Sequence, residues 1–301
     1  MKTYVVTGGA GFIGTNLCER LVADGEKVIV VDNLVAGNAE RLPRAVDFRL
    51  LDVCDTEALV RTFSQADVVV HLAALPRVQF SIEHPFEAQH VNIDGTLSVL
   101  EAMRRAKVPR IVYAASSAMY GDQEMLPLNE SLPAQPKSPY GLHKYVGELM
   151  LSLWHELHGI ESVSLRFFNV YGPHLDPEGA YALVIGRFLK LRKEGKPLTI
   201  TGDGEQTRDF VHVRDVVDAI IRAGNAEHVG KGEVFNVGTG QDVSINTLAQ
   251  LIGGPIEYVP ARVEPRFTRA DSTRLREVLG WHPSVSLEEG IIELKRIFQI
   301  T

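Results

Sequence analysis

Apolar residues in the first 170 positions follow two alternating patterns. Short runs of branched residues, of strand length, alternate with longer segments whose apolar residues recur at helical spacing. The strand-length runs are residues 4–6, 28–31, 67–71, 111–115 and 163–166. The helical segments between them are residues 16–23, 56–63, 96–105 and 141–158. Because the runs are continuously apolar, both faces of the sheet must be covered. The pattern predicts a doubly wound α/β domain with a parallel sheet over residues 1–172.

The pattern changes after about residue 173. One helix is predicted around 183–194, a turn lies at Gly202-Asp203-Gly204, and another helix starts at Asp215. Short strands are expected near Phe235 and Ile256, and residues 234–237 are a candidate last strand of the main sheet. We therefore expect a smaller α+β region over residues 173–301. No long linker separates the two regions, so their interface is the expected ligand site.

Composition and charge exclude several kinds of partner. The chain has 301 residues, 45% of them hydrophobic, and a formal net charge of -7 without basic clusters. It lacks the electrostatic footprint of a protein that binds nucleic acid or acidic membranes. Its two cysteines fit a reducing compartment, and no leader or membrane span is evident, so we expect a cytoplasmic protein. His155 and His158 lack a third ligand at metal spacing, so we expect no metal.

A glycine-rich loop directly follows the first strand, with the sequence Gly8-Gly9-Ala10-Gly11-Phe12-Ile13-Gly14. Backbone without side chains can turn tightly and approach a pyrophosphate, while the helix that follows offers unpaired amides. The second strand ends at Asp32, where a carboxylate can accept both ribose hydroxyls and repel a 2'-phosphate. Loop and carboxylate together predict a Rossmann domain that binds NAD rather than NADP. The alternative is that Asp32-Asn33 is only a polar turn.

Three residues form a candidate catalytic set. Tyr140 and Lys144 lie four apart at the start of a helix, so both side chains leave one face. An ammonium nearby favours the phenolate form of a tyrosine, and Lys144 can supply that charge. Ser116 follows an apolar strand, at the carboxyl edge where such sheets bind ligands. Tyr-x-x-x-Lys alone usually belongs to a solvated helix face. In combination with the glycine-rich loop and the serine at the strand end, it predicts a functional site.

These residues resemble one family, the extended short-chain dehydrogenases/reductases, and within it the nucleotide-sugar epimerase/dehydratase group. The resemblance covers essentially the whole chain. In the family's order the sequence carries Gly8 to Gly14, Asp32-Asn33, Asp52-Val53, His71-Leu72-Ala73-Ala74, Asn92, Ser116, Tyr140-Gly-Leu-His-Lys144, Arg166-Phe-Phe-Asn-Val-Tyr-Gly-Pro173 and Arg208-Asp-Phe-Val-His212.

The resemblance implies a role for each of these positions. The implied cofactor contacts are Gly8, Gly11, Phe12, Ile13, Gly14, Asp32, Asn33, Asp52, Val53, Leu72, Ala73, Ala74, Asn92, Tyr140, Lys144 and Phe168. The implied contacts with a UDP-sugar are Arg77, Ser116, Ser117, Tyr140, Asn169, Arg208, Arg262, Arg266 and Thr268. Asp52 and Val53 would flank the adenine, and Phe168 would pack near the nicotinamide. Simpler readings stay open: Asp52 as the cap of the helix near Thr56, and Arg208 as a surface ion pair.

The residues after the catalytic serine bear on the reaction. A 4,6-dehydratase of this family carries an Asp-Glu pair there, and a decarboxylase typically keeps the glutamate, whereas this chain has Ser117-Ala118. These side chains do no acid-base work. The resemblance therefore favours 4-epimerisation by transient oxidation at carbon 4 of the sugar. A non-catalytic NAD sensor is the alternative from another class, which the intact Ser116, Tyr140 and Lys144 disfavour.

The sequence leaves the sugar open. Residues 179–182 with Val184-Ile185 resemble the 4-epimerases that prefer N-acetylated UDP-hexoses, and Thr268 stands where some UDP-galactose 4-epimerases have a bulky aromatic. The family's Arg-x-Gly-Asp is Arg262-Val-Glu-Pro here, so either Arg262 or Arg266 is the diphosphate ligand. Arg77 lies in the loop expected to face the sugar and could bind a carboxylate, so a UDP-glucuronate 4-epimerase stays an alternative.

The resemblance also implies a homodimer. Helices over residues 92–105 and 141–158 are similar to those through which the family dimerises as a four-helix bundle. Apolar residues that suit such an interface, or equally an ordinary core, are Leu97, Leu100, Met103, Met150, Leu153 and Trp154.

Overall fold

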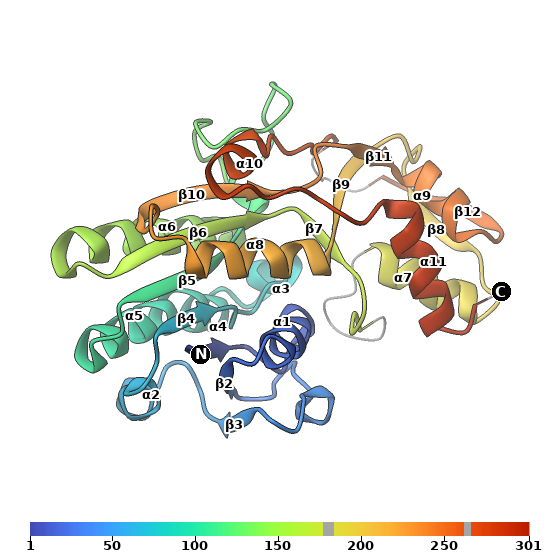
Figure 1. The fold of residues 1–301 in the computed structure, drawn as a ribbon. Coiled ribbons are helices and arrows are strands. Elements are labelled where there is room, and N and C mark those ends of the chain that lie inside the picture. The colour runs from blue at the N-terminus through green and yellow to red at the C-terminus, as the bar shows by residue number, and fades with distance from the viewer. Residues whose placement is uncertain (177–183, 262–265, 301) are drawn as a thin grey trace.

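The computed structural model describes residues 1–176, 184–261 and 266–300, and its largest element is a parallel sheet of seven strands. The strands run in the order β10-β6-β5-β4-β1-β2-β3 (Figure 1). They are β1 (Thr3–Thr7), β2 (Lys27–Asp32), β3 (Asp47–Leu50), β4 (Val68–His71), β5 (Arg110–Ser116), β6 (Glu161–Phe167) and β10 (Lys231–Val237). The order reverses between β1 and β4, and ligands of such sheets bind at the carboxyl ends of the strands at this reversal.

Helices cover both faces of this sheet (Figure 1). One face packs against α1 (Phe12–Ala23) and α8 (Val213–Asn225), through strand residues such as Val6 and Val70. The other face packs against α2 (Thr56–Phe63), α5 (Gly95–Ala106) and α6 (Pro139–His158), through their neighbours Val5 and Val69. Successive strand residues point to opposite faces, so continuous valine runs serve two cores at once.

Short elements follow β4 on the way to α5. These are α3 (Val78–Glu83), α4 (Pro85–Gln89) and a π-helical turn (His90–Asp94) that leads directly into α5. A further short 3-10 turn (Ser117–Met119) follows β5, and another (Ala39–Arg41) lies between β2 and β3. The turns after β4 and β5 continue from the carboxyl ends of their strands, at the edge where the predicted site lies.

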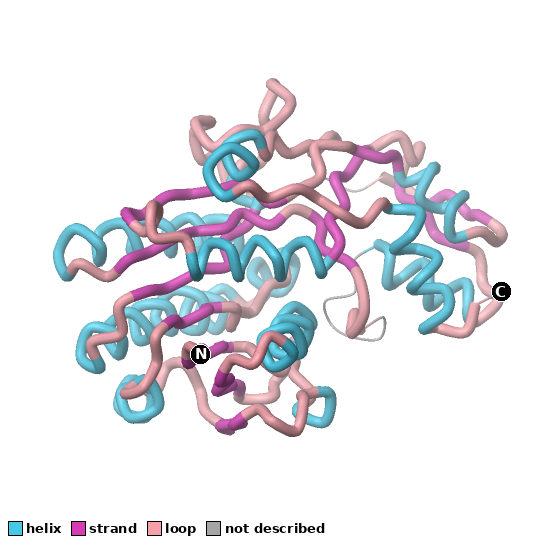
Figure 2. Tube along the Cα trace, in the orientation of Figure 1, coloured by secondary structure: helices cyan, strands magenta, loops and turns pink. Residues whose placement is uncertain are grey.

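The second region is built around two small sheets (Figure 2). One has the order β11 (Asp242–Ser244), β9 (Thr207–His212), β7 (Asn169–Tyr171), and the other pairs β12 (Ile256–Val259) with β8 (Leu198–Thr201). Helices α7 (Val184–Lys193), α9 (Ile245–Ile252) and α11 (Leu287–Ile297) share their core, which includes Phe188, Leu248 and Leu294. Helix α10 (Thr273–Leu279) instead buries Leu275 and Leu279 in the core of α1 and α8.

The doubly wound parallel sheet predicted from the sequence is confirmed, including its last strand. Residues 231–237 form β10 and pair in parallel with β6. The boundary at residue 172 stays a prediction, and the chain returns to the first core after it through α8, β10 and α10. The patterns did not identify β3, β8, β9, α9, α10 or α11. The structure describes no helix that is long and apolar enough to cross a membrane.

Candidate active site

The glycine loop brings the start of α1 close to two strands. Gly8 has a left-handed φ of 69°, and a Cβ there would lie 2.7 Å from the amide nitrogen of Ala73. At Gly14 a Cβ would lie 2.5 Å from the carbonyl oxygen of Gly8 and from the Cα of Gly9. Gly11 precedes the helix without a side-chain cap, and the amides of Phe12 and Ile13 have no hydrogen-bond partner in the described parts of the chain. The loop is thus shaped to receive an anionic group.

Asp32 lies buried at the carboxyl end of β2, beside this loop. Its two oxygens accept hydrogen bonds from the amides of Ala10 (3.0 Å) and Leu34 (2.8 Å). Burial raises the pKa of the Asp32 carboxyl above its usual value, while these two bonds oppose the shift. Each carboxylate oxygen has a second lone pair for another donor such as a ribose hydroxyl. Asp32 is therefore a buried carboxylate rather than a solvated polar turn, and its contact with a ribose stays a prediction.

Asp52 and Asn33 lie together next to that carboxylate. The Asn33 side chain donates to Asp52 Oδ2 at 2.9 Å, and the Cys54 amide donates to Oδ1 at 2.8 Å. Asp52 does not cap the following helix, because the cap is Asp55, which accepts from the amide of Ala58. Although partial burial raises the pKa of Asp52, the hydrogen bonds lower it more, so the group stays charged.

The segment after β4 is fixed against the same loop. Buried Asn92, in the π-helical turn, accepts from the Leu75 amide (2.7 Å) and donates to its carbonyl (3.1 Å). The backbone of Leu72 and Ala73 is bound to Thr7 of β1. These bonds place the backbone of Leu72 and Ala73 beside Gly8. The predicted contact of Leu72, Ala73 and Ala74 with the cofactor stays a prediction. Asn92 itself uses both ends of its amide to hold Leu75.

Ser116 and Tyr140 meet at the carboxyl end of β5. Ser116 is the last residue of that strand, and its hydroxyl accepts from the amide of Ala118 at 3.1 Å. The Ser116 hydroxyl also lies near enough to the Tyr140 phenol to lower the pKa of that phenol. Helix α6 can approach this closely because it has Gly141 after Tyr140, where a Cβ would lie 2.6 Å from the Ala118 carbonyl. The predicted serine and tyrosine are therefore brought together.

Lys144 is buried one turn further along α6, only 4% exposed. Its Nζ lies 4.8 Å from the centre of the Tyr113 ring, a cation–π contact from β5. Burial lowers the pKa of Lys144 to about 7, and the charge of Glu148 opposes this shift. The predicted effect of Lys144 on Tyr140 is not seen in the protein's own groups: burial raises the pKa of the Tyr140 phenol, and only the Ser116 hydroxyl lowers it.

The residues expected to meet a UDP-sugar gather along β7 and β9. Ser116 pairs with Phe167 across β5 and β6, and the next residue, Phe168, is buried against Tyr120. Asn169 begins β7 and donates to the carbonyl of Asp209 at 3.0 Å. Strand pairing thus connects Ser116, the predicted catalytic serine, with Asp209, the neighbour of Arg208.

Arg208, Arg266 and Thr268 also lie together, because residues 266–268 pair with the start of β9. The amide of Thr207 donates to the Arg266 carbonyl, and the amide of Thr268 donates to the Thr207 carbonyl. Arg266 is mostly exposed and forms an ion pair with exposed Asp203 at 3.2 Å. Arg262 and residues 179–182 lie outside the described residues, so the choice between Arg262 and Arg266 stays open.

Arg77 and Ser117, both predicted to contact the substrate, lie in segments next to the start of α6. Arg77 is half-buried and directly precedes α3, whose Ser81 accepts a hydrogen bond from the Tyr140 amide at 3.1 Å. Ser117 is half-buried and opens the short turn after β5. Both predicted substrate residues therefore belong to segments that contact the start of α6.

Sequence reasoning missed several residues that shape this site. Ser81 accepts from the Tyr140 amide, Tyr113 and Glu148 act on Lys144, and Arg166 binds Glu148; these are the residues that were missed. Glu148 carried a readable signal, since it follows Lys144 by four residues on one helical face. The other three come from distant segments.

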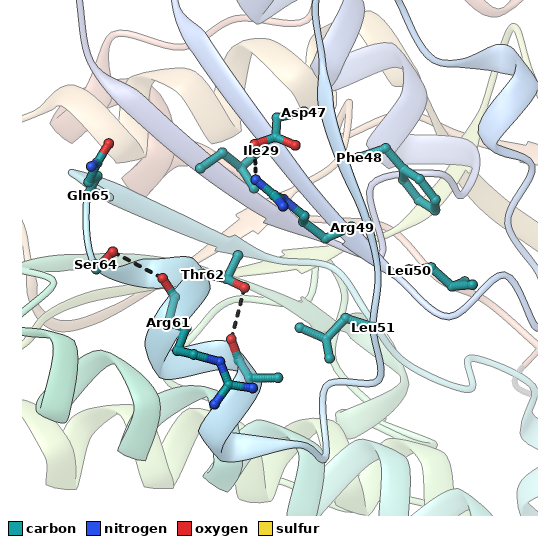
Figure 3. A pocket seen from close by; sticks show the side chains of 11 residues that line it. Ile29, Asp47, Phe48, Arg49, Leu50, Leu51, Arg61, Thr62, Ser64 and Gln65 are labelled. Carbon is teal, nitrogen blue, oxygen red and sulfur yellow. Dashed lines mark hydrogen bonds and ion pairs between the residues drawn. The ribbon is translucent and has the colours of Figure 1, made fainter.

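A surface pocket of about 560 Å³ between β3 and α2, lined by Arg49 and Arg61, contains none of the predicted site residues (Figure 3).

Comparison of the whole chain with known proteins identifies its family. Residues 4–238 match the model of the NAD dependent epimerase/dehydratase family. A UDP-glucose 4-epimerase of Mycolicibacterium smegmatis is 40% identical over 99% of both chains. The solved structure of UDP-glucose 4-epimerase from Thermotoga maritima, with UDP-glucose, is 38% identical, with a TM-score of 0.94 over 99% of this chain and 98% of that one. The chain therefore belongs to the NAD-dependent epimerase/dehydratase family.

NAD is the cofactor of this family, and the glycine loop and Asp32 fit it. The Thermus thermophilus UDP-glucose 4-epimerase, solved with NAD, is 34% identical over 99% of both chains, with a TM-score of 0.91. Other relatives act on different sugars by name. They include a UDP-glucuronate 4-epimerase (34% identical), a UDP-N-acetyl-alpha-D-glucosaminuronate decarboxylase (33%) and a solved UDP-N-acetylglucosamine 4-epimerase (33%). The class of enzyme is thus defined more narrowly than its substrate.

Proposed function

We propose that this protein is a UDP-hexose 4-epimerase, which inverts the hydroxyl at carbon 4 of the sugar by transient oxidation there. The observation that carries the proposal is that Ser116 and Tyr140 lie together beside buried Lys144. The two residues after Ser116 in the sequence are Ser117 and Ala118. Dehydration or decarboxylation would call for an acid-base side chain at these last two positions, whereas epimerisation needs none. Relatives named UDP-glucose 4-epimerase at 40% identity support the same reaction.

NAD would be held by the segments already described. The amides of Phe12 and Ile13 would receive its diphosphate, Asp32 the adenosine ribose, and Asp52 with Val53 the adenine. Bound NAD would supply the acceptor for the hydride of carbon 4 and the donor from which the opposite face of that carbon receives it back. The negative charge of Asp32 would repel the extra phosphate of NADP.

The chain's own residues would move the proton. Tyr140 would accept the proton of the carbon 4 hydroxyl and later return it, and Ser116 would orient that hydroxyl by a hydrogen bond. Because burial raises the pKa of Tyr140, its deprotonation requires positive charge nearby. Lys144 is the protein's group for this role, one turn along the same helix.

The second region would hold the UDP-sugar. Asn169 and Arg208 would contact the nucleotide-sugar, and Arg266 or Arg262 its diphosphate. Thr268 is small and has a hydroxyl, so it leaves room for an acetamido group and can bond to it. UDP-N-acetylglucosamine should therefore be accepted at least as well as UDP-glucose.

A panel of UDP-sugars tests this proposal. The purified enzyme is incubated with UDP-glucose, UDP-N-acetylglucosamine and UDP-glucuronate, and the products are analysed by NMR and mass spectrometry. The expected product has unchanged mass and inverted configuration at carbon 4. A main product lighter by water or carbon dioxide contradicts epimerisation, and retained NAD without any turnover favours the sensor alternative.

A second candidate substrate is UDP-glucuronate, favoured by Arg77. This arginine directly precedes the helix that contacts the Tyr140 amide, and a guanidinium binds a carboxylate with two parallel hydrogen bonds. If UDP-glucuronate is the best substrate and Arg77→Ala removes that activity alone, the carboxylate reading replaces the acetamido reading.

We further propose that the chain forms a homodimer through α5 and α6. Leu97 of α5 and Leu142, Leu149, Leu153 and Leu157 of α6 are each at least 40% exposed, and such a run of apolar side chains suits burial against a second copy. Leu100 and Met103 are fully buried and belong to the core, while Met150 and Trp154 pack partly against it. Leu149→Glu and Leu153→Glu together should yield monomers in sedimentation experiments, and an unchanged particle mass would contradict this interface.

A further inference from the structure

Helix α6 carries a second ionisable side chain into the buried layer beneath it. Glu148 follows Lys144 by four residues and is 5% exposed, so both groups leave one face of the helix and are shielded from water. Arg166 of β6 binds Glu148 with two hydrogen bonds, Nε to Oε1 at 2.9 Å and Nη2 to Oε2 at 2.7 Å. Burial raises the pKa of Glu148, while the hydrogen bonds and charge of Arg166, followed by the charge of Lys144, oppose this shift and favour the carboxylate. This carboxylate lies one helical turn from Lys144, where little solvent weakens its field.

Arg166 is itself held by a chain of hydrogen bonds. Its Nη1 donates to the Tyr120 hydroxyl at 2.8 Å, and that hydroxyl donates to Asn236 Oδ1 at 2.8 Å. The Asn236 amide of β10 in turn donates to the carbonyls of Leu128 and Asp271. The pair is therefore fixed in position from three separate segments, and Glu148 cannot swing away from Lys144 without breaking this chain.

The strands beneath α6 present no other carboxylate to Lys144 in the described parts of the chain. His71 of β4 is fully buried, and burial and the charge of Lys144 lower its pKa to about 3, so it is neutral. Tyr113 of β5 presents its ring, and burial raises the pKa of its phenol. Arg166 of β6 is positive, with its charge directed at Glu148.

The helix itself adds two more groups. Tyr140 is a neutral phenol in the protein alone, because burial raises its pKa. His143 is buried, and burial followed by the charge of Lys144 lowers its pKa. Glu148 is then the group whose charge stabilises the ammonium form of Lys144 against burial.

We propose that Glu148, fixed by Arg166, is a positioning residue that stabilises the ammonium form of Lys144 in its buried setting. Its importance for catalysis rests on the proposed function, in which the ammonium ion assists Tyr140. The electrostatic part does not, because it concerns only the protonation of one buried lysine.

A double-mutant cycle tests the electrostatic part without measuring activity. The free energy of unfolding is measured with saturating NAD for the unmodified protein, Glu148→Gln, Lys144→Met and the double variant, at pH 6 and at pH 9. Lys144 carries its charge at the lower pH and has lost it at the higher one. We expect a favourable coupling between the two residues at pH 6 that disappears at pH 9. Equal coupling at both values overturns the proposal, because packing alone does not depend on pH.

The pH profile of turnover tests the catalytic part. Removal of the carboxylate lowers the pKa of Lys144, so the lysine loses its charge at a lower pH. The alkaline limb of the activity profile should therefore shift to lower pH by about one unit. Glu148→Gln should approach normal kcat at low pH, and Glu148→Asp, which keeps the charge, should restore the limb. Glu161→Gln is the matched control. It breaks the ion pair between Arg110 and Glu161, the first residues of β5 and β6, far from Lys144 along the strands, and it should leave the alkaline limb in place.

The outcomes separate this proposal from the proposed function. A pH-dependent coupling with an unmoved limb supports the protonation of Lys144 by Glu148 but contradicts its part in catalysis. If Glu148→Gln does not fold, Arg166→Lys gives a second test: lysine keeps the charge but not the two parallel hydrogen bonds, so a less firmly held Glu148 should shift the limb to lower pH. An unmoved limb, or a shift to higher pH, in that variant overturns the proposal.

Discussion

The site residues on the two sides of residue 172 are held in different ways. Before it, Asp32, Asn92 and Lys144 are buried on or beside regular elements and are fixed by the backbone of neighbouring strands and turns. After it, Arg266 and Thr268 lie on an irregular segment that pairs with β9, and Arg266 is mostly exposed. The predicted cofactor residues thus lie on or beside the main sheet, whereas Arg266 and Thr268, which are predicted to meet the substrate, depend on how separate segments meet.

This difference suggests how such a protein can change its substrate. Substitutions at exposed positions of an irregular segment cost little stability, so the sugar can be exchanged while the cofactor half stays intact. Substitutions in the cofactor half disturb buried contacts and should therefore have larger effects. The following predictions test this ranking, beginning with the largest effect.

Tyr140→Phe should reduce kcat by about two to four orders of magnitude, because it removes the proton acceptor but keeps the ring. NAD content and UDP-sugar affinity should stay nearly normal, as measured by absorbance and calorimetry. Tyr145→Phe, the same change on the same helix, is the control and should retain most activity. A loss below tenfold in Tyr140→Phe would assign the base to another residue.

Gly14→Ala should abolish NAD retention and destabilise the fold by roughly 1–3 kcal/mol through overpacking. The new Cβ would lie 2.5 Å from backbone atoms of Gly8 and Gly9, which cannot turn aside as a side chain can. Gly224→Ala in α8 is the control, since its Cβ would meet only ordinary contacts at 3.6 Å. Chemical denaturation and NAD content measure both effects, and equal behaviour of the two variants would contradict the close approach.

Asp32→Ala should lower the preference for NAD over NADP by at least about tenfold, since like charges at a binding site cost several kcal/mol. Because Asp32 also accepts from the amides of Ala10 and Leu34, Asp32→Asn is measured beside it. Asparagine keeps an acceptor and removes the charge, so it should relax the preference with less loss of stability. Equal affinity of the unmodified protein for both cofactors would refute the role of Asp32.

Thr268→Tyr should lower kcat/KM on UDP-N-acetylglucosamine relative to kcat/KM on UDP-glucose. The expected change in the ratio corresponds to about 1–3 kcal/mol in transition-state free energy. An aromatic ring would collide with the acetamido group but not with a hydroxyl. Stability should hardly change, as expected for the irregular segment, and Thr268→Ser should keep the original selectivity. An equal loss on both sugars would show that Thr268 does not face carbon 2.

The sequence predicted the cofactor half more completely than the substrate half, for a physical reason. Val28 to Val31 with Asp32, or Tyr140 with Lys144, are local patterns whose geometry follows from strand and helix periodicity. Even there, the start of α6 was placed two residues late, although Ser138 caps the helix and Pro139 follows it.

Contacts between distant segments left no comparable pattern. Asp209 illustrates this, because its buried carboxylate accepts hydrogen bonds from Thr239, Gly240 and Ala270 and thereby positions the segment of Thr268. Nothing in the spacing of these residues indicates that they meet. Glu148 and Arg166 are a similar case, since only the helix half of the pair could be placed on the face of Lys144.

Strand β10 has a consequence for the order in which the chain folds. It completes the seven-stranded sheet beside β6, yet 63 residues separate the end of β6 at Phe167 from the start of β10 at Lys231. During synthesis β6 therefore emerges as an edge strand with unpaired backbone groups and with Val163, Leu165 and Phe167 on one apolar face. A nascent chain that stops before residue 231 keeps this edge open and should be captured by chaperones or aggregate. The ribosome must release the β10 segment before the cofactor half is safe from association with other chains.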